Sequence, residues 1–463
     1  MIRERLTNLL ALRDWTEHMF ATRKVEATED LEVIPITSRG SKASVLFWLW
    51  FASNLTIGDF LIGLLAQDYG LGYSSTVIAL AIGTILGGVL LALMSVMGPI
   101  FGMSQMRIGR YTFGRKGGII MSLLQWGNTL GWFTFNSIIA ASALALAIGT
   151  RLYAIPIAVT VLLVLGLILL GHKTIQRFER GMSLVLGILF VIILAYSIEK
   201  IGVLGSSSTP VAFSAVSFGW IVAFSFSYIM SWGPYASDYS KHLEPTVSRK
   251  SIAVYVLLGA GLASFFSELV GFYVGMATNS TSSNPAEPLA QFLGKYALIG
   301  LYFLFLGGLS ANAINLYSNT MSIRAAGVRM GRKYIAVIVS VIAGVLAYLG
   351  YNSFYVSYEN FLFILDYWIT PWIAIMLVDF FLRYRQYLKG GYREIVNYRA
   401  IFAYLLGIVI SVPFMYPSEY FIGPIAYRLG FDISYFVSFI VAALAYYLLQ
   451  RSHENKSTNS LPT

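Results

Sequence analysis

The chain has 463 residues, of which 57% are hydrophobic and 12% are charged, against about 25% charged residues in soluble domains. This composition is that of an integral membrane protein and excludes a string of soluble domains. The absence of cysteine excludes disulfides and thiolate metal sites, and the four histidines lie in termini or polar connections. The net charge of +10 is spread between apolar segments, so we assign it to cytoplasmic loops and expect no nucleic-acid partner.

Residues 1–44 are polar and are expected to form a cytoplasmic N-terminal segment. Their apolar run, Leu9 to Leu12, is too short for the core of a signal peptide. The stretch from Ile2 to Phe20 suits either a short interfacial helix or a disordered segment. A second polar segment, residues 450–463, is expected to be a cytoplasmic tail.

From residue 45 onward, apolar segments long enough to cross a bilayer alternate with short polar connections. We predict twelve transmembrane helices, at 45–66, 76–97, 118–149, 153–171, 181–199, 213–237, 250–276, 297–323, 334–350, 355–382, 400–416 and 432–449. With both termini cytoplasmic, the inner connections hold nineteen Lys and Arg residues and the outer connections hold four, Arg151, Lys200, Lys295 and Arg428. This positive-inside bias supports the count and predicts a multi-pass protein of the plasma membrane.

The first and sixth predicted helices both have a polar centre between apolar flanks. The sixth contains the stretch SFSYIMSWGPYASD, in which Pro234 removes a backbone donor, so we expect a break near Trp232. Irregular backbone within a bilayer is tolerated only where it is buried in protein or lines a cavity. Paired interrupted helices are typical of inverted-repeat secondary transporters with a midplane site. We therefore predict repeats at 45–199 and 213–382, with two further helices at 400–449 that have no assigned transport role.

Four segments in order carry a resemblance to a known family: VEATEDLEVIPITSRG (25–40), GPIFGMSQMRIGRYTFGRKGG (98–118), SWGPYASDYSKHLEP (231–245) and LSANAINLYSNT (309–320). Through them the chain resembles the nucleobase-cation-symport-1 family and, within it, the purine-cytosine permeases. The resemblance implies an all-α, leucine-transporter-like membrane fold, with a 5+5 inverted repeat, discontinuous helices 1 and 6, and two extra C-terminal helices. It also implies import of a nucleobase or related heterocycle driven by Na⁺ or H⁺.

Candidate substrate residues lie on the third, sixth and eighth predicted helices. Trp132 and Asn136 share one helix face, and the resemblance implies that they stack on the base and bond its edge; the alternative is an interfacial indole with an interhelical amide. Asn312, Asn315 and Asn319 also share a face. Either these amides join helices at about 1 kcal/mol each, or, as the resemblance implies, Asn315 or Asn312 binds the base edge; we favour Asn315.

On the sixth helix, Tyr228, Ser231 and Trp232 are predicted to shape the other wall of the site. The position that the family often fills with an aromatic residue is Ile229 here, which leaves either Tyr228 or Trp232 to supply the second ring. For Asp238, at the start of the polar loop, we expect a structural role.

Two coupling ions are considered. By analogy with the family, Na⁺ would lie between the carbonyls near Phe51 and Asn54 and the Ser310 hydroxyl; Leu309, where some members have a hydroxyl, weakens this assignment. The rival is a proton carried by Asp59, because intramembrane acids are costly and usually functional. For Asp366 and Asp379 we expect salt bridges.

The leading hypothesis is a monomeric, cation-coupled importer of cytosine or a purine that works by alternating access. The alternative is a proton-coupled carrier of a hydantoin, allantoin or another small heterocycle. A channel would need a continuous polar stripe, whereas the polar groups gather at the centres of four spans. An intramembrane enzyme would need a nucleophile with a base, or metal ligands, so we expect no enzymatic activity and no cofactor beyond the coupling ion.

Overall fold

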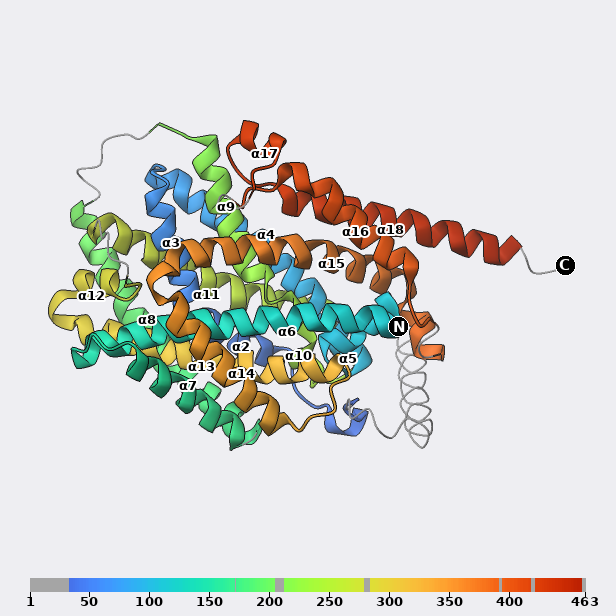
Figure 1. Ribbon diagram of the computed structural model, residues 1–463, viewed down its shortest axis with the longest axis horizontal. Coiled ribbons are helices and arrows are strands. Elements are labelled where there is room, and N and C mark those ends of the chain that lie inside the picture. Colours follow the sequence, from blue (N-terminus) through green and yellow to red (C-terminus); the bar gives the residue numbers. More distant parts are fainter. Residues whose placement is uncertain are drawn as a thin grey trace.

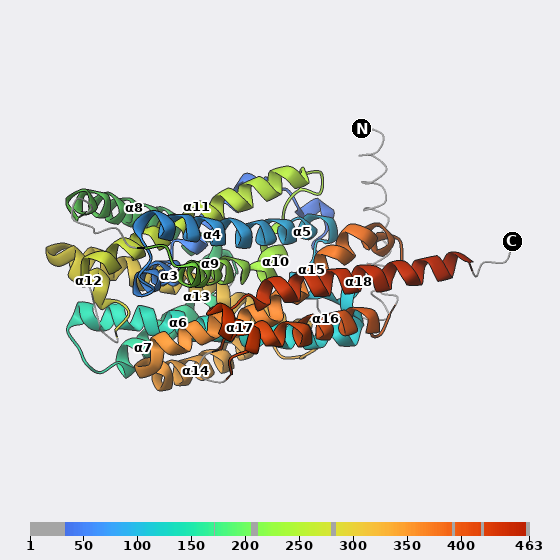
Figure 2. The same ribbon diagram turned by 90° about the horizontal axis from the view of Figure 1, so that it is seen from above.

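The computed structural model describes residues 33–170, 172–204, 212–278, 284–390, 394–417 and 421–459, so the segment Ile2 to Phe20 lies outside the described residues. Within those ranges the regular structure is helical, apart from an isolated bridge between Ser41 and Leu243. The long helices lie side by side along the long axis of the molecule, and α18 extends beyond the others at one end (Figures 1 and 2).

The elements in chain order are η2 (Ile36–Ser38), α2 (Ser44–Asn54), α3 (Ile57–Asp68), α4 (Tyr73–Ser95), α5 (Met97–Phe101), α6 (Gln105–Ile148), α7 (Ala154–Leu169), α8 (His172–Leu204), α9 (Ala215–Met230), η4 (Gly233–Tyr235), α10 (Ala236–Ser240), α11 (Arg249–Thr278), α12 (Glu287–Leu293), η5 (Gly294–Tyr296), α13 (Ala297–Ala325), α14 (Arg332–Gly350), η6 (Tyr351–Ser353), α15 (Phe354–Gly390), α16 (Tyr398–Ser411), η7 (Val412–Phe414), α17 (Pro424–Leu429) and α18 (Ser434–Asn459).

Every predicted span overlaps a helix or a broken helix. Within the described residues, seven helical stretches are long and apolar enough to cross a membrane, and the bent pair α2 and α3 makes an eighth. One of the seven, Arg332–Gly390, contains both α14 and α15, while α7 and α16 are apolar but shorter. The all-helical membrane architecture is confirmed, and the count of twelve crossings stays a prediction.

The first span is broken at its centre, as predicted. α2 ends at Asn54, α3 begins at Ile57, and the two helices are bent by 54°. Between them, Leu55 (φ −80°, ψ 59°) and Thr56 (φ −125°, ψ 166°) leave helical geometry. This break exposes backbone and side-chain polar groups in the middle of the bundle, where the neighbouring helices supply their partners.

The sixth span is interrupted near Trp232, where the sequence predicted a break, but the interruption is a tightened turn. α9 ends at Met230, and the N–H groups of Trp232 and Tyr235 donate to carbonyls three residues earlier, at 3.3 and 3.0 Å. Trp232 keeps right-handed dihedrals (φ −74°, ψ −12°). A 3₁₀ turn accommodates Pro234, because the fixed φ of proline suits its first residues.

Glycines bring helix backbones into direct contact at several places in the bundle. A Cβ on Gly83 would lie 2.6 Å from the carbonyl oxygen of Val222 on α9. A Cβ on Gly63 of α3 would lie 1.7 Å from the carbonyl oxygen of Glu268 on α11. Close approach through small residues is the usual way in which membrane helices associate, and here it fixes α4 on α9 and α3 on α11.

The long helix α6 is kinked at Gly114, whose dihedrals (φ 80°, ψ 167°) are not helical. The segment 394–397 before α16 pairs with the freed backbone groups on both sides of the kink. The N–H groups of Arg115 and Lys116 donate to the carbonyls of residues 394 and 395, and Asn397 donates to the carbonyls of residues 112 and 113. The basic stretch 102–118 is thus mostly buried, with Phe113 fully enclosed.

The described parts of the four segments that carry the family resemblance are linked to one another by hydrogen bonds. Arg39 donates to the carbonyls of Ile34 and Pro99, at 2.6 and 3.0 Å, and covers Gly102. Burial lowers the pKa of Arg39 to about 10, which leaves it charged at neutral pH. Asp238 accepts hydrogen bonds from the Gln105 N–H (2.9 Å) and the Ser318 hydroxyl (3.1 Å), so its predicted structural role is the one that the structure displays.

Candidate functional site

Trp132 of α6 lies against the break in the first span and against α9. Its ring contacts Tyr228 edge to face, with centroids 5.2 Å apart at 84°, and Phe361 of α15 in the same way at 5.2 Å and 79°. The Tyr228 hydroxyl is 2.7 Å from that of Thr56, and its ring lies where a Cβ on Gly58 would be. The broken first span therefore shapes one wall of an aromatic cage around Trp132.

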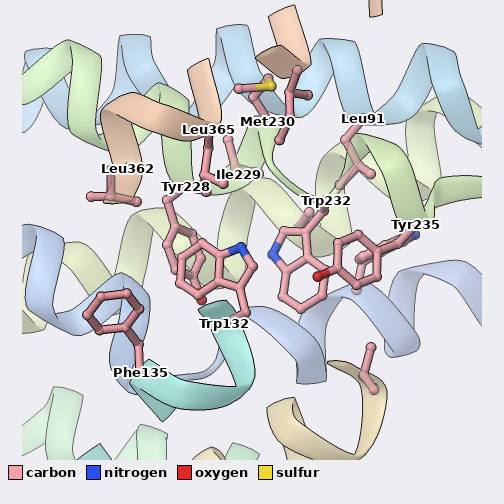
Figure 3. Packing of buried hydrophobic residues seen from close by; sticks show 14 of the residues in the cluster. Leu91, Trp132, Phe135, Tyr228, Ile229, Met230, Trp232, Tyr235, Leu362 and Leu365 are labelled. Carbon is pink, nitrogen blue, oxygen red and sulfur yellow. The ribbon is translucent and has the colours of Figure 1, made fainter. Parts of the chain in front are cut away.

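Trp232 and Asn315 lie next to this cage and are joined through Tyr235. Trp232 and Tyr235 contact edge to face at 5.1 Å, and the Tyr235 hydroxyl donates to the Asn315 carbonyl oxygen at 2.9 Å. In Figure 3 the nitrogen-bearing edges of Trp132 and Trp232 are turned toward each other. The Trp232 indole N–H and the Asn315 amide nitrogen are buried and have no hydrogen-bond partner among the described residues.

The three asparagines of α13 have different partners although they share a helix face. Asn312 donates to the Phe133 carbonyl (3.1 Å) and the Ser137 hydroxyl (2.9 Å) of α6. Asn319 donates to the Trp126 carbonyl (2.9 Å) and the Thr129 hydroxyl (2.8 Å) of the same helix.

The donor groups of Asn312 and Asn319 thus join α13 to α6, which is the interhelical role that the sequence left open. Only the Asn315 amide, of these three, keeps its donor groups available. Asn136, one turn from Trp132, is 4% exposed, and its own backbone carbonyl packs against Gly308 of α13.

On α9 the structure separates the residues that the sequence grouped. Ile229 packs into α4, where its Cγ2 is 2.2 Å from the position of a Cβ on Gly87. The Ser231 hydroxyl donates to the Tyr228 carbonyl at 2.6 Å, which is a local helix-end bond. Of the residues that the sequence grouped here, Tyr228 contacts the Trp132 ring, and Trp232, just after the end of α9, contacts Tyr235.

The residues predicted for the coupling ion lie on different sides of the first break. Asn54 donates to the Trp50 carbonyl (2.8 Å), and its side-chain oxygen accepts from Ser264 of α11 (3.3 Å). The Phe51 carbonyl accepts the Leu55 N–H at 3.1 Å. Ser310 is fully buried on α13, and Asp59 is buried in the first turn of α3.

The remaining membrane acids are hydrogen-bonded acceptors. Asp379 forms the predicted salt bridge, with Arg383 at 2.6 Å, and also accepts from Thr112 and Tyr446. Asp366 was expected to form a salt bridge, but it accepts a hydrogen bond from the Ser227 hydroxyl of α9. The helix face that carries Asp366 therefore meets a polar side chain of the sixth span in place of the expected basic partner.

Sequence reasoning missed Tyr235 as a neighbour of the site and gave Thr56 and Glu268 no specific role. Tyr358 was missed as well; it donates to the Gly58 carbonyl at 3.1 Å and lies 6.2 Å from the Trp132 ring. The proximity of Tyr235 to Pro234 was the one local signal. The others are brought in by helices more than a hundred residues away, so no spacing in the sequence indicates them.

A helical bundle with one span broken at its centre and an aromatic and amide cluster beside the break defines a membrane transporter. Residues 33–438 match the family model described as permease for cytosine/purines, uracil, thiamine, allantoin. A putative purine-cytosine permease of Bacillus subtilis is 27% identical over 92% of this chain and 96% of its own length. The purine-cytosine permease of Emericella nidulans is 26% identical, over 87% and 84% of the two chains.

Solved structures show the same fold. A nucleobase-cation-symport-1 family transporter in a closed conformation with bromovinylhydantoin bound superposes with a TM-score of 0.74 at 20% identity, covering 91% of this chain and 94% of that one. A Na⁺-coupled sialic acid symporter in a substrate-bound outward-open state gives 0.62 at 12% identity, covering 96% and 95%. The chain belongs to the family of permeases for cytosine and purines, uracil, thiamine and allantoin. These proteins are permeases and not enzymes.

Proposed function

We propose that this permease imports a nucleobase, cytosine or a purine, by cation symport with alternating access. The observation that carries the proposal is the buried Trp132 ring together with two buried donors, on Trp232 and Asn315, that have no hydrogen-bond partner in the part of the chain that the structure describes. A flat heterocycle stacks on an indole, and its ring nitrogens and carbonyl oxygens accept hydrogen bonds. A ligand with both features would satisfy donors whose burial otherwise costs about 1–3 kcal/mol each.

In this proposal the chain crosses the plasma membrane twelve times as a monomer with both ends in the cytoplasm, and residues 45–199 and 213–382 are the two inverted repeats. The interruptions of the first and sixth spans support the repeat, because they occupy corresponding places in the two halves. Asn136 and Ser231 complete the substrate wall beside Trp132, and Asn312 lends its unpartnered carbonyl oxygen. Closure around the ligand and a cation would then switch the site from the outer to the inner face.

Two cations, Na⁺ and H⁺, are candidates for the coupling ion. Na⁺ would use the carbonyls of Phe51 and Asn54 and the hydroxyl of Ser310, all oxygen ligands of the kind that a hard cation prefers. H⁺ would use Asp59. The likeness to the bromovinylhydantoin-bound transporter supports a second substrate class, in which the flat ring is a hydantoin or allantoin instead of a nucleobase.

A thermal-shift screen of the purified protein tests the substrate. Cytosine, uracil, adenine, hypoxanthine, allantoin and hydantoin are added singly, because a ligand that binds only the folded state raises the melting temperature. We expect one of them to raise it in the wild type and not in Trp132→Ala or Asn315→Ala. Asn319→Ala is the matched control, since that amide bonds α6 and should keep the response. A response retained in full by Trp132→Ala and Asn315→Ala refutes the site.

Uptake into proteoliposomes tests the coupling to an ion gradient. The wild type should accumulate the ligand above its external concentration when an inward Na⁺ or H⁺ gradient is imposed. Collapsing both gradients should reduce uptake to equilibration. Accumulation that persists without either gradient would exclude symport.

A further inference from the structure

A second buried polar centre lies between α3 and α11, and Tyr228 lies between it and the substrate site. Asp59 stands in the first turn of α3, directly after the break, and Glu268 stands at the middle of α11. The two helices touch backbone to backbone at Gly63 and Gly271. Because Asp59 is one turn from Gly63, this contact brings the two carboxyl groups near enough to interact electrostatically.

Hydroxyl groups surround these two acids. Glu268 Oε2 accepts from Ser225 of α9 at 2.9 Å and from Thr84 of α4 at 3.1 Å. The hydroxyls of Ser264 and Tyr228 face Asp59. Glu268 Oε1 and both oxygens of Asp59 are buried without a partner that meets hydrogen-bond geometry.

The titratable groups that face the pair from the neighbouring helices are Tyr228 of α9 and Tyr358 of α15. Among the described residues no Lys, Arg or His acts on either carboxyl, and no cluster of acids and histidines there could hold a metal ion. Two carboxylates without a counter-charge in a low-dielectric interior repel each other and lose their hydration. One proton shared by the pair removes the mutual repulsion, and a second proton neutralises the remaining charge.

Tyr228 connects the pair to the substrate site. Its ring edge lies on Trp132, its hydroxyl bonds Thr56 in the broken segment, and the same hydroxyl faces Asp59. Any rearrangement of the break that follows substrate binding therefore moves a group that both sites share. Such a shared two-position element is what couples two binding equilibria.

We infer that Asp59 and Glu268 together form the proton-binding site that couples transport to the H⁺ gradient. The inference rests on the proposed function and selects its ion. The pair keeps one shared proton throughout, and a second proton from the outer side binds it when the substrate fills the site, so that both carboxyl groups are neutral when the break closes. When the site opens inward, the proton leaves to the cytoplasm with the substrate. Ser225 and Thr84 position Glu268 through their hydroxyl donors.

The carbonyl oxygens assigned to Na⁺ already accept hydrogen bonds within the protein. The Phe51 carbonyl already accepts the Leu55 N–H, and the Asn54 carbonyl accepts the Ser267 hydroxyl at 3.3 Å. The Asn54 side-chain oxygen accepts from Ser264 of α11. Sodium would share each of these oxygens with a hydrogen-bond donor, whereas Glu268 Oε1 and both oxygens of Asp59 are open to a proton.

The experiment compares two assays in proteoliposomes with radiolabelled cytosine or hypoxanthine, whichever the thermal-shift screen selects. In the wild type, an inside-alkaline gradient of one pH unit without Na⁺ should drive accumulation of about tenfold for one proton per substrate. The double variant, Asp59→Asn with Glu268→Gln, should lose this accumulation. It should keep equilibrium counterflow, because a permanently neutral pair still permits exchange of substrate across the membrane. Asp366→Asn, a buried carboxyl hydrogen bonded by Ser227, is the control and should keep accumulation.

Wild-type accumulation that follows the Na⁺ gradient and ignores pH overturns the inference, and so does full H⁺-driven accumulation by Asp59→Asn with Glu268→Gln. If these variants do not fold, the wild type alone decides. Its substrate dissociation constant should rise about tenfold per pH unit above the titration of the pair, and a pH-independent constant refutes the inference. Failure of the proposed function is distinct, since then no heterocycle of the screen binds at any pH.

Discussion

Substitution of Gly63 by alanine tests the packing that holds the carboxyl pair together. A Cβ there would lie 1.7 Å from the carbonyl oxygen of Glu268 and 2.7 Å from the backbone nitrogen of Phe272, whereas ordinary contact begins at 3.4 Å. Both obstacles are backbone atoms, which cannot rotate away. Helices α3 and α11 must therefore separate by about 1.7 Å, judged from the carbonyl contact.

Overpacking of this kind costs about 1–3 kcal/mol, which for a chain of 463 residues corresponds to a melting temperature lower by about 1–3 °C. Gly166→Ala is the matched control, because nothing lies within 4 Å of a Cβ at that position of α7 and alanine favours a helix by about 1 kcal/mol. Differential scanning fluorimetry of the detergent-purified variants measures both. A Gly63→Ala protein that melts at or above the wild-type temperature would show that the two backbones are not in contact.

Trp132→Ala should weaken heterocycle binding by about 5- to 150-fold, since stacking a base on an aromatic ring is worth about 1–3 kcal/mol; isothermal titration calorimetry measures the change, and Trp132→Phe should lose less. Asn319→Ala should lower the melting temperature with an unchanged dissociation constant, because its amide bonds α6 only; altered affinity would contradict that assignment. Thr56→Val, which removes the hydroxyl partner of Tyr228, should slow transport more than it weakens binding, measured as uptake rate against dissociation constant; equal losses would place Thr56 in the substrate site itself.

The sequence predicted the helix positions and both interruptions, because hydropathy, proline chemistry and buried polar centres are local signals. Pro234 cannot donate to the preceding turn, and the structure forms its 3₁₀ turn there. The sequence did not predict that the turn keeps right-handed dihedrals, since that depends on how α9 packs on α4. For the same reason the packing of Ile229 against Gly87 was not foreseen.

The roles of the amides and acids were harder to predict. Asn312, Asn315 and Asn319 share one helix face. The first and the last of them nevertheless donate hydrogen bonds to the hydroxyls of Ser137 and Thr129 on α6. Which amide stays available is decided by the register of α6 on α13, which no local pattern encodes. Likewise, Asp59 was singled out as an acid in the membrane, but its neighbour Glu268 lies on a helix far along the chain.

The kink at Gly114 connects α6 to the two C-terminal helices through hydrogen bonds. The segment before α16 forms hydrogen bonds with backbone groups on both sides of the kink, and Asn397 also donates to Tyr446 of α18. If α6 bends further at Gly114, it must therefore either break these hydrogen bonds or move α16 with it. The terminal helices therefore restrain α6, the helix that carries Trp132. A chain that ends before residue 394 would lack these hydrogen bonds to α6.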